Sequence, residues 1–216
     1  MISVGPRPPE APRDCPLCPR LVTYRLANTE AHPQWWNGAV ASFGDPAARL
    51  AVVGLAPGRT GANRTGRPFT GDHAGILLYQ TLLKTGFARG RYEARPDDGL
   101  RLVDCMITNA VRCAPPGNKP ETVEEATCRP FLSARLRALP ELKVIVTLGD
   151  VARRNVLRAV GLKASAGLGG HGSESQAGSY ALINSYHCSR LNTNTGRLTP
   201  EMFEAVFRRA RTLLDG

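Results

Sequence analysis

The sequence predicts an α/β fold, a three-layer αβα sandwich around a central four-stranded parallel sheet. Short, continuous apolar runs alternate with helical patterns, and a polar motif follows each run. Strands that alternate with helices form a parallel sheet with helices on both faces. The chain has 216 residues, which suits one hydrophobic core. We therefore expect residues 1–216 to form a single domain, with residues 1–14 as a Pro-rich N-terminal arm.

Four apolar segments are expected to be buried parallel strands, because each is a short run without polar alternation. They span residues 50–54, 102–108, 144–148 and 180–184. Helical patterns occupy residues 76–85, 122–138, 151–160 and 200–214. Pro140 ends the second of these patterns and Gly161 ends the third.

A distinctive motif follows each expected strand. In chain order the motifs are GLAPGRTGANRTGRPFTGDHAG, NAVRCAPPGNKP, GDVARR and SYHCSRLNTNTGR. In open α/β sheets, ligands bind outside the carboxyl ends of the strands. The four motifs should therefore converge on one sheet edge and form an enzyme site there.

The charge of the chain favours an anionic partner. The formal net charge is +10, and excess basic residues raise the local concentration of phosphates. Nucleic acid is the first candidate, although an arginine-rich codon usage would also produce solvated surface charge. No run approaches the ~20 apolar residues needed to span a bilayer. The segment MISVGPRPPEAPR has no apolar core of signal-peptide length, so a cytoplasmic protein is expected.

Four of the six cysteines are expected to bind a metal or cluster. They form one CPLC pair and two later single residues, namely Cys15, Cys18, Cys113 and Cys128. This set suits a tetrahedral zinc or an iron–sulfur cluster, and the spacing does not choose between them. A disulfide or a thioredoxin-like pair is less favoured, because the pair precedes the first strand. Cys105 and Cys188 are interpreted as buried core residues.

The motifs GLAPG, NRTGRPFTGD, NAVRCAPP and SYHCSRLNTNTGR resemble those of the family 5, or type B, uracil-DNA glycosylases. The resemblance runs from Cys15 to about Met202. It implies an αβα fold, a four-iron four-sulfur (4Fe-4S) cluster held by the four cysteines named above, and action on deaminated bases in DNA. Many superfamily members carry a carboxylate or Asn where this chain has Ala56, Pro57 and Gly58. The catalytic carboxylate is therefore expected elsewhere.

Catalysis on a base in DNA requires that the nucleotide be flipped into a pocket. Phe69 is predicted to be the stacking wall of that pocket, since an aromatic face can stack on any base. Breaking the glycosidic bond builds positive charge on the sugar and negative charge on the base. The resemblance places Asp72 where water and sugar meet, and His187 is predicted to donate to uracil O2. The alternative interpretation of Asp72 is a turn or helix-cap residue, since it lies just before the helical pattern that starts at residue 76.

Asn109 is predicted to read the base edge, and the backbone amides of Gly54, Leu55 and Ala56 are predicted to face the base. Predicted DNA-contacting residues lie in the second and fourth motifs and are Asn118, Arg190, Asn192, Asn194 and Arg197. For Asn118, a turn residue is the simpler interpretation. Lys119 is the only lysine in a motif. A Schiff-base lyase needs such an amine, so simple hydrolysis is expected.

The sequence thus predicts a monofunctional DNA-repair glycosylase that hydrolyses the N-glycosidic bond of uracil, and of other deaminated bases, to leave an abasic site. We expect a monomer that acts on nucleoid DNA without a membrane partner. A non-catalytic iron–sulfur protein that binds nucleic acid is the alternative, and the pairing of Asp72 with His187 separates the two. Electron transfer through a cluster is a third class that only the cysteines would support.

Overall fold

The core of the fold is a mixed sheet of six strands in the order β1-β5-β2-β6-β8-β7. The computed structural model describes residues 8–167 and 169–216. The strands of the sheet are β1 (Phe43–Gly44), β2 (Leu50–Gly54), β5 (Cys105–Asn109), β6 (Val144–Leu148), β7 (Glu174–Ala177) and β8 (Tyr180–Ser185). The inner four strands are parallel, while β1 and β7 pair antiparallel at the edges. The predicted four-stranded parallel sheet is therefore present, but it is the centre of a larger sheet.

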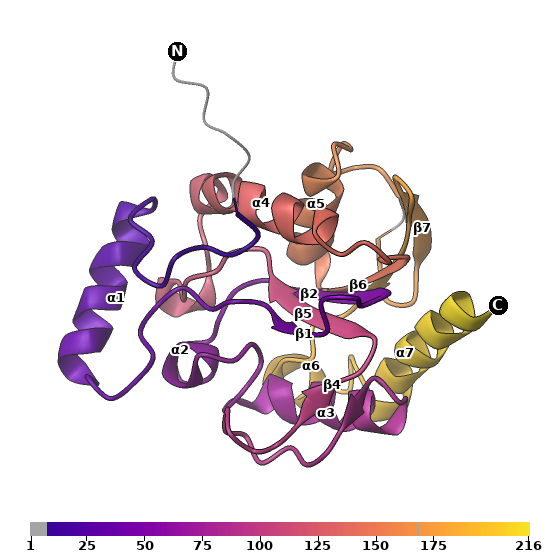
Figure 1. The fold of residues 1–216 in the computed structure, drawn as a ribbon, viewed down its shortest axis with the longest axis horizontal. Helices are drawn as coiled ribbons and strands as arrows, with labels where there is room; N and C mark the ends of the chain where they lie inside the picture. Colours follow the sequence, from indigo (N-terminus) through magenta and orange to yellow (C-terminus); the bar gives the residue numbers. More distant parts are fainter. Residues whose placement is uncertain (1–7, 168) are drawn as a thin grey trace.

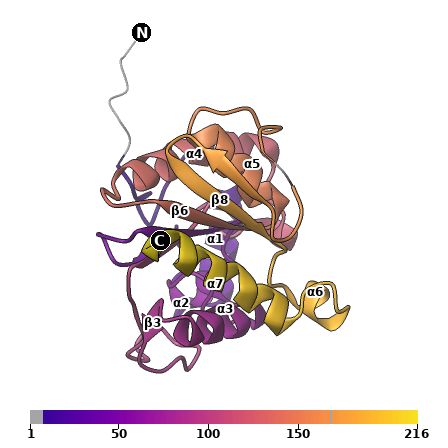
Figure 2. The same ribbon diagram turned by 90° about the vertical axis from the view of Figure 1, so that its right-hand side faces the viewer.

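Helices cover both faces of this sheet, as predicted. The helices are α1 (Pro19–Ala31), α2 (Ala62–Thr65), α3 (His73–Lys84), the 3₁₀ helix η1 (Pro116–Asn118), α4 (Thr122–Arg137), α5 (Asp150–Ala159), α6 (Arg190–Asn194) and α7 (Pro200–Asp215). Helices α4 and α5 lie on one face, and α3 and α7 lie on the other (Figures 1 and 2). The three-layer αβα architecture is confirmed.

The alternation of side chains along β2 explains the two-sided core. Leu50 and Val52 pack in the cluster that contains residues of α3 and α7. Ala51 and Val53 pack in the cluster that contains residues of α4 and α5. Since successive residues of a strand point to opposite faces, every position of this buried strand must be apolar or small. The strand therefore reads as a continuous apolar run.

The predicted strand over residues 102–108 is wrong at its first residues. Leu102 pairs with Ala88 in a separate two-stranded sheet formed by β3 (Ala88–Arg89) and β4 (Arg101–Leu102). Asp104 has a φ of 53°, a left-handed conformation that ends strand pairing. The central strand β5 consequently begins at Cys105.

The N-terminal segment packs on the domain. Residues 1–7 of the predicted arm lie outside the described residues, and residues 8–14 form neither helix nor strand. Glu10 accepts hydrogen bonds from Arg112 and Arg135. Helix α1, which the sequence patterns did not predict, begins directly after Cys18. Among the described residues, no helix combines the length and apolar character needed to cross a membrane.

Candidate active site

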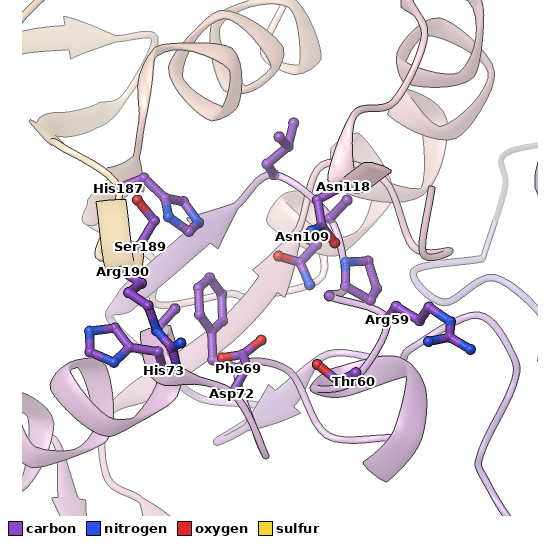
Figure 3. A pocket seen from close by; sticks show the side chains of 15 residues that line it. Arg59, Thr60, Phe69, Asp72, His73, Asn109, Asn118, His187, Ser189 and Arg190 are labelled. Atoms are coloured by element: carbon purple, nitrogen blue, oxygen red, sulfur yellow. The ribbon is translucent and has the colours of Figure 1, made fainter. Parts of the chain in front are cut away.

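A pocket of about 500 Å³ lies at the carboxyl ends of the parallel strands. The loops after β2, β5 and β8 contribute to its lining, whereas no residue of the GDVARR motif after β6 does, so three of the four motifs converge on this pocket as predicted. Figure 3 shows the side chains of Phe69, Asp72, Asn109 and His187 around this pocket. Leu55, Ala56, Asn118 and Arg190, which were also predicted site residues, line it too.

Asp72 has one carboxylate oxygen in a helix cap. The other lies near the loop after β2 that contains Gly58 and Gly61, here called the glycine loop. Oδ1 accepts a hydrogen bond of 3.2 Å from the Gly75 backbone amide and so caps α3. Oδ2 packs against the loop after β2, where a Cβ at Gly58 or Gly61 would lie 2.9 or 2.2 Å from it. No described residue donates a hydrogen bond to Oδ2. The capping interpretation is thus correct for Oδ1, and Oδ2 remains available to a ligand in the pocket.

Phe69 borders the pocket in a strained backbone conformation. Its φ is 53°, which costs a non-glycine residue on the order of 1–3 kcal/mol. The ring is buried in the hydrophobic cluster shared with β2 and α3, and it also lines the pocket. Its centroid lies 6.1 Å from that of His187. Core packing and pocket wall, which the sequence analysis treated as alternatives, therefore coexist at this residue.

A buried ion pair fixes the segment that carries Phe69. Arg67 donates to both oxygens of Asp98 at 2.8 and 2.7 Å, and its Nε donates to Thr70 Oγ1 at 2.8 Å. The Tyr79 hydroxyl donates to the Pro68 carbonyl at 2.6 Å. Despite its burial, hydrogen bonds from Arg67 hold the pKa of Asp98 well below its usual range. These contacts on both sides of Phe69 offset the cost of its backbone conformation.

Asn109 ends β5 opposite Gly54 in the register of the sheet. It is 2% exposed, and its Oδ1 has no hydrogen-bond partner among the described residues. A Cβ on Gly54 would lie 2.5 Å from this oxygen and 2.4 Å from Cζ of Phe69. Gly54 does not line the pocket itself. Because Gly54 has no side chain, it leaves room for the side chains of Asn109 and Phe69. This packing role replaces its predicted role as a base-facing residue.

His187 follows β8 and lines the pocket opposite Asn109 (Figure 3). Burial lowers the pKa of its imidazole, and the carboxylate of Asp72 partly opposes that shift. The side-chain amide of Asn192 donates to the His187 carbonyl at 2.8 Å. Asn192, a predicted DNA contact, therefore has a clear structural role in holding the His187 loop. Ser189 caps the N-terminus of α6 in the same loop.

The other predicted DNA-contacting residues are distributed around the pocket. Asn118 is exposed at the end of η1 with a φ of 56°, in keeping with its turn interpretation. Asn194 is exposed at the end of α6, and the Arg197 guanidinium lies 4.4 Å from the Tyr186 ring centroid. Of the predicted set, Asn118 and Arg190 line the pocket, whereas Asn192, Asn194 and Arg197 do not.

Four polar side chains that line the pocket were not predicted from the sequence, namely Arg59, Thr60, His73 and Ser189. Arg59 and Thr60 lie in the first motif, and His73 directly follows Asp72. Their positions within motifs were a usable signal. Their residue types alone do not distinguish lining residues from ordinary loop residues.

The four cysteines predicted as ligands pack together beside α1. Cys15, Cys113 and Cys128 belong to one buried cluster and Cys18 packs against it. All six cysteines are free thiols, and Cys105 and Cys188 are buried as expected. Burial raises the pKa of Cys113 to about 12 and that of Cys128 to about 11. Among the described residues, no three His, Cys, Asp or Glu side chains are placed to hold a metal ion.

Comparison with known proteins places this geometry in a family. Residues 41–211 match the profile of the uracil DNA glycosylase superfamily. A type-5 uracil-DNA glycosylase of Thermus thermophilus is 45% identical over 205 residues, which cover 92% of this chain and 93% of that protein. A type-5 enzyme of Pyrobaculum aerophilum is 41% identical over 201 residues, covering 91% and 88% of the two chains. A type-4 enzyme of the same organism is 31% identical over 153 residues, covering 70% and 64%. The chain therefore belongs to the uracil DNA glycosylase superfamily and, within it, to the type-5 family.

Proposed function

We propose that this protein is a DNA-repair enzyme that hydrolyses the bond between uracil and deoxyribose in DNA and leaves an abasic site. The observation that carries the proposal is one pocket lined by a carboxylate, a histidine whose pKa is lowered by burial, and a buried amide oxygen that has no hydrogen-bond partner among the described residues. Family membership supports the same activity. A protein that only binds nucleic acid needs no such combination. Release of free uracil from a uracil-containing duplex, with alkali-sensitive abasic sites in the product, tests the activity.

Binding of the flipped nucleotide rests on Phe69 and Asn109. Extrusion of a base costs a few kcal/mol of free energy. Stacking of the base on an aromatic face offsets ~1–3 kcal/mol of that cost. The Asn109 side chain presents both a carbonyl oxygen and an amide NH₂. The oxygen accepts from uracil N3–H and the NH₂ donates to O4. Cytosine presents the opposite pattern at both positions, so it forms neither hydrogen bond with the amide in this orientation.

Bond cleavage separates charge, and the pocket stabilises both ends. The Asp72 carboxylate holds the attacking water through Oδ2 and stabilises the cationic sugar. His187 donates a hydrogen bond to uracil O2 as negative charge develops on the base. The water supplies a hydroxyl to C1′ of the sugar, and the leaving base takes up the remaining proton. No covalent bond to the protein forms.

The pH dependence of base release tests the role of His187. A lowered pKa keeps its imidazole neutral above pH 6.5, and a neutral imidazole retains one N–H donor. We expect the single-turnover rate to be flat from pH 6.5 upward, because the neutral imidazole and its N–H donor persist over that range. His187→Gln, which keeps a donor that does not titrate, should show the same flat profile. A rate that falls as the pH rises from 6.5 to 8 would show that the imidazolium is the active form.

We also propose that Cys15, Cys18, Cys113 and Cys128 hold a 4Fe-4S cluster. All four donors are thiols, they come from two separate chain segments, and they pack in one buried group. The Arg112 backbone amide donates to Cys128 Sγ at 3.3 Å, a contact suited to a thiolate. A four-iron cluster presents a separate iron to each thiolate, so the four thiols need not converge on one point. The group would join the N-terminal segment to β5 and α4.

Metal analysis tests this assignment. We expect iron and inorganic sulfide in equal amounts in anaerobically purified protein, and loss of both in Cys15→Ser. Helix α1 buries only Leu21 and Asn28, so loss of the ligand should also loosen α1 and lower the melting temperature. Cys105→Ala, in a cysteine outside the group, should retain the iron. Stoichiometric zinc without sulfide would overturn the cluster assignment.

A further inference from the structure

The pocket carries an arginine on each of two opposite sides. Arg190 lies on the α6 side and Arg59 on the side that faces α1 (Figure 3). Neither guanidinium is within ion-pair distance of a carboxylate among residues 8–167 and 169–216. Among the described residues that line the pocket, Asp72 is the one acidic residue. Both sides of the pocket mouth are therefore electropositive.

Contacts with α1 and the turn after it hold Arg59 in a fixed orientation. Its Nε donates to Asn28 Oδ1 at 2.7 Å, and its Nη2 lies 3.1 Å from His32 Nε2. Asn28 is 3% exposed, and its Nδ2 donates to the Tyr24 carbonyl at 2.8 Å. That bond directs Oδ1 toward Arg59. Because a guanidinium only donates hydrogen bonds, His32 Nε2 is the acceptor in this contact.

An aromatic stack supports the same guanidinium. The rings of His32 and Trp35 stack with centroids 3.9 Å apart and an interplanar angle of 8°. The Arg59 guanidinium carbon lies 5.5 Å from the Trp35 ring centroid. None of these partners is an acidic residue, so the charge of Arg59 is not neutralised by them. Its Nη1 has no hydrogen-bond acceptor among the described residues.

A fixed and uncompensated guanidinium beside the pocket suits a phosphodiester group. Arginine presents a planar fork of N–H donors that matches phosphate oxygens. A nucleotide flipped into the pocket has a phosphate on each side, and Arg190 lies on the α6 side of the pocket. We infer that Arg59, held by Asn28, His32 and Trp35, binds a backbone phosphate of the DNA strand on the side of the pocket opposite α6. This inference rests on the proposed function, which supplies the DNA.

The salt dependence of DNA binding tests this inference. The probe is a duplex with a stable abasic-site analogue, and the readout is fluorescence anisotropy over a series of NaCl concentrations. Arg59→Gln keeps a donor for Asn28 but removes the charge. We expect it to weaken binding roughly tenfold at low salt and to reduce the slope of log K against log salt by about 0.9, as for one lost phosphate contact. Arg59→Lys should retain most of the slope.

Arg208→Gln is the matched control, since Arg208 is an exposed arginine of α7 outside the pocket, paired with Glu204. It should keep the parental slope. A parental slope in Arg59→Gln, together with a lower melting temperature, would show that Arg59 only fastens its loop to α1 and would overturn the inference. The probe needs no turnover, so this test does not depend on base release. If Arg59→Gln has a smaller slope than the parent protein but the parent protein releases no uracil, the proposed function alone is overturned.

Phosphate-ethylation interference gives a second test on the parent protein, independent of any variant. Ethylated phosphates that block binding should fall on both sides of the lesion. Interference confined to one side would overturn the inference.

Discussion

Replacing Asp72 with Asn should slow single-turnover uracil release by on the order of 10²-fold or more, with folding and DNA binding preserved. The two oxygens of this carboxylate have separate surroundings. Oδ1 accepts from Gly75, whereas Oδ2 has no donor among the described residues and faces the glycine loop. Asn is as good an N-cap as Asp, so the substitution removes the charge and keeps the cap. The measurement is the single-turnover rate on a uracil duplex, together with thermal melting.

Thr199→Ala is the control for the loss of a cap. Thr199 accepts a hydrogen bond from the Met202 amide at the start of α7 and does not line the pocket. Its replacement should cost ~1 kcal/mol of stability and leave the rate unchanged. If Asp72→Asn melts early but releases uracil at the parental rate, Asp72 is a capping residue only. Catalysis would then depend on His187, Asn109 and backbone dipoles.

Replacing Asn109 with Ala should slow uracil release by roughly 10- to 100-fold, because a lost hydrogen bond to a buried polar group is worth ~1–3 kcal/mol. The unpartnered Oδ1 and the 2% exposure of Asn109 make this side chain available only to a ligand in the pocket. Release of hypoxanthine, whose edge differs from that of uracil, should fall less. The comparison requires single-turnover rates on matched duplexes with each lesion.

A uniform loss on every lesion would contradict this role and would mean that Asn109 supports the end of β5. Asn109→Asp separates the possibilities further. It preserves size, but its carboxylate cannot donate to O4 and repels the departing uracil anion. We therefore expect Asn109→Asp to release uracil more slowly than Asn109→Ala.

The central strands could be predicted because burial on both faces leaves a continuous apolar run, as in β2 and β6. The edge strands could not. Strand β1 has two residues, and the residues of β7 are Glu, Ser, Gln and Ala, which carry no strand pattern. Helix α1 buries only Leu21 and Asn28 and has no side-chain cap. Its position depends on contacts with distant segments, such as the hydrogen bond that Arg59 donates to Asn28.

The composition of the site could be predicted in outline because parallel strands bring their following loops to one edge. Asp72, Asn109 and His187 lie together for this reason. The separate surroundings of the two Asp72 oxygens could not be predicted, since they depend on the path of the glycine loop after β2. Arg59 was missed because its partners lie on α1 and in the turn that follows it, about thirty residues earlier in the chain.

The most direct test of the account is intact-mass measurement of a uracil-containing duplex after incubation with the purified protein. We expect the uracil strand to lose the base, gain one water and remain unbroken, and we expect borohydride to trap no protein–DNA adduct. A duplex that the protein binds but whose mass does not change would contradict the proposed activity. A strand broken at the lesion, or a trapped adduct, would contradict simple hydrolysis.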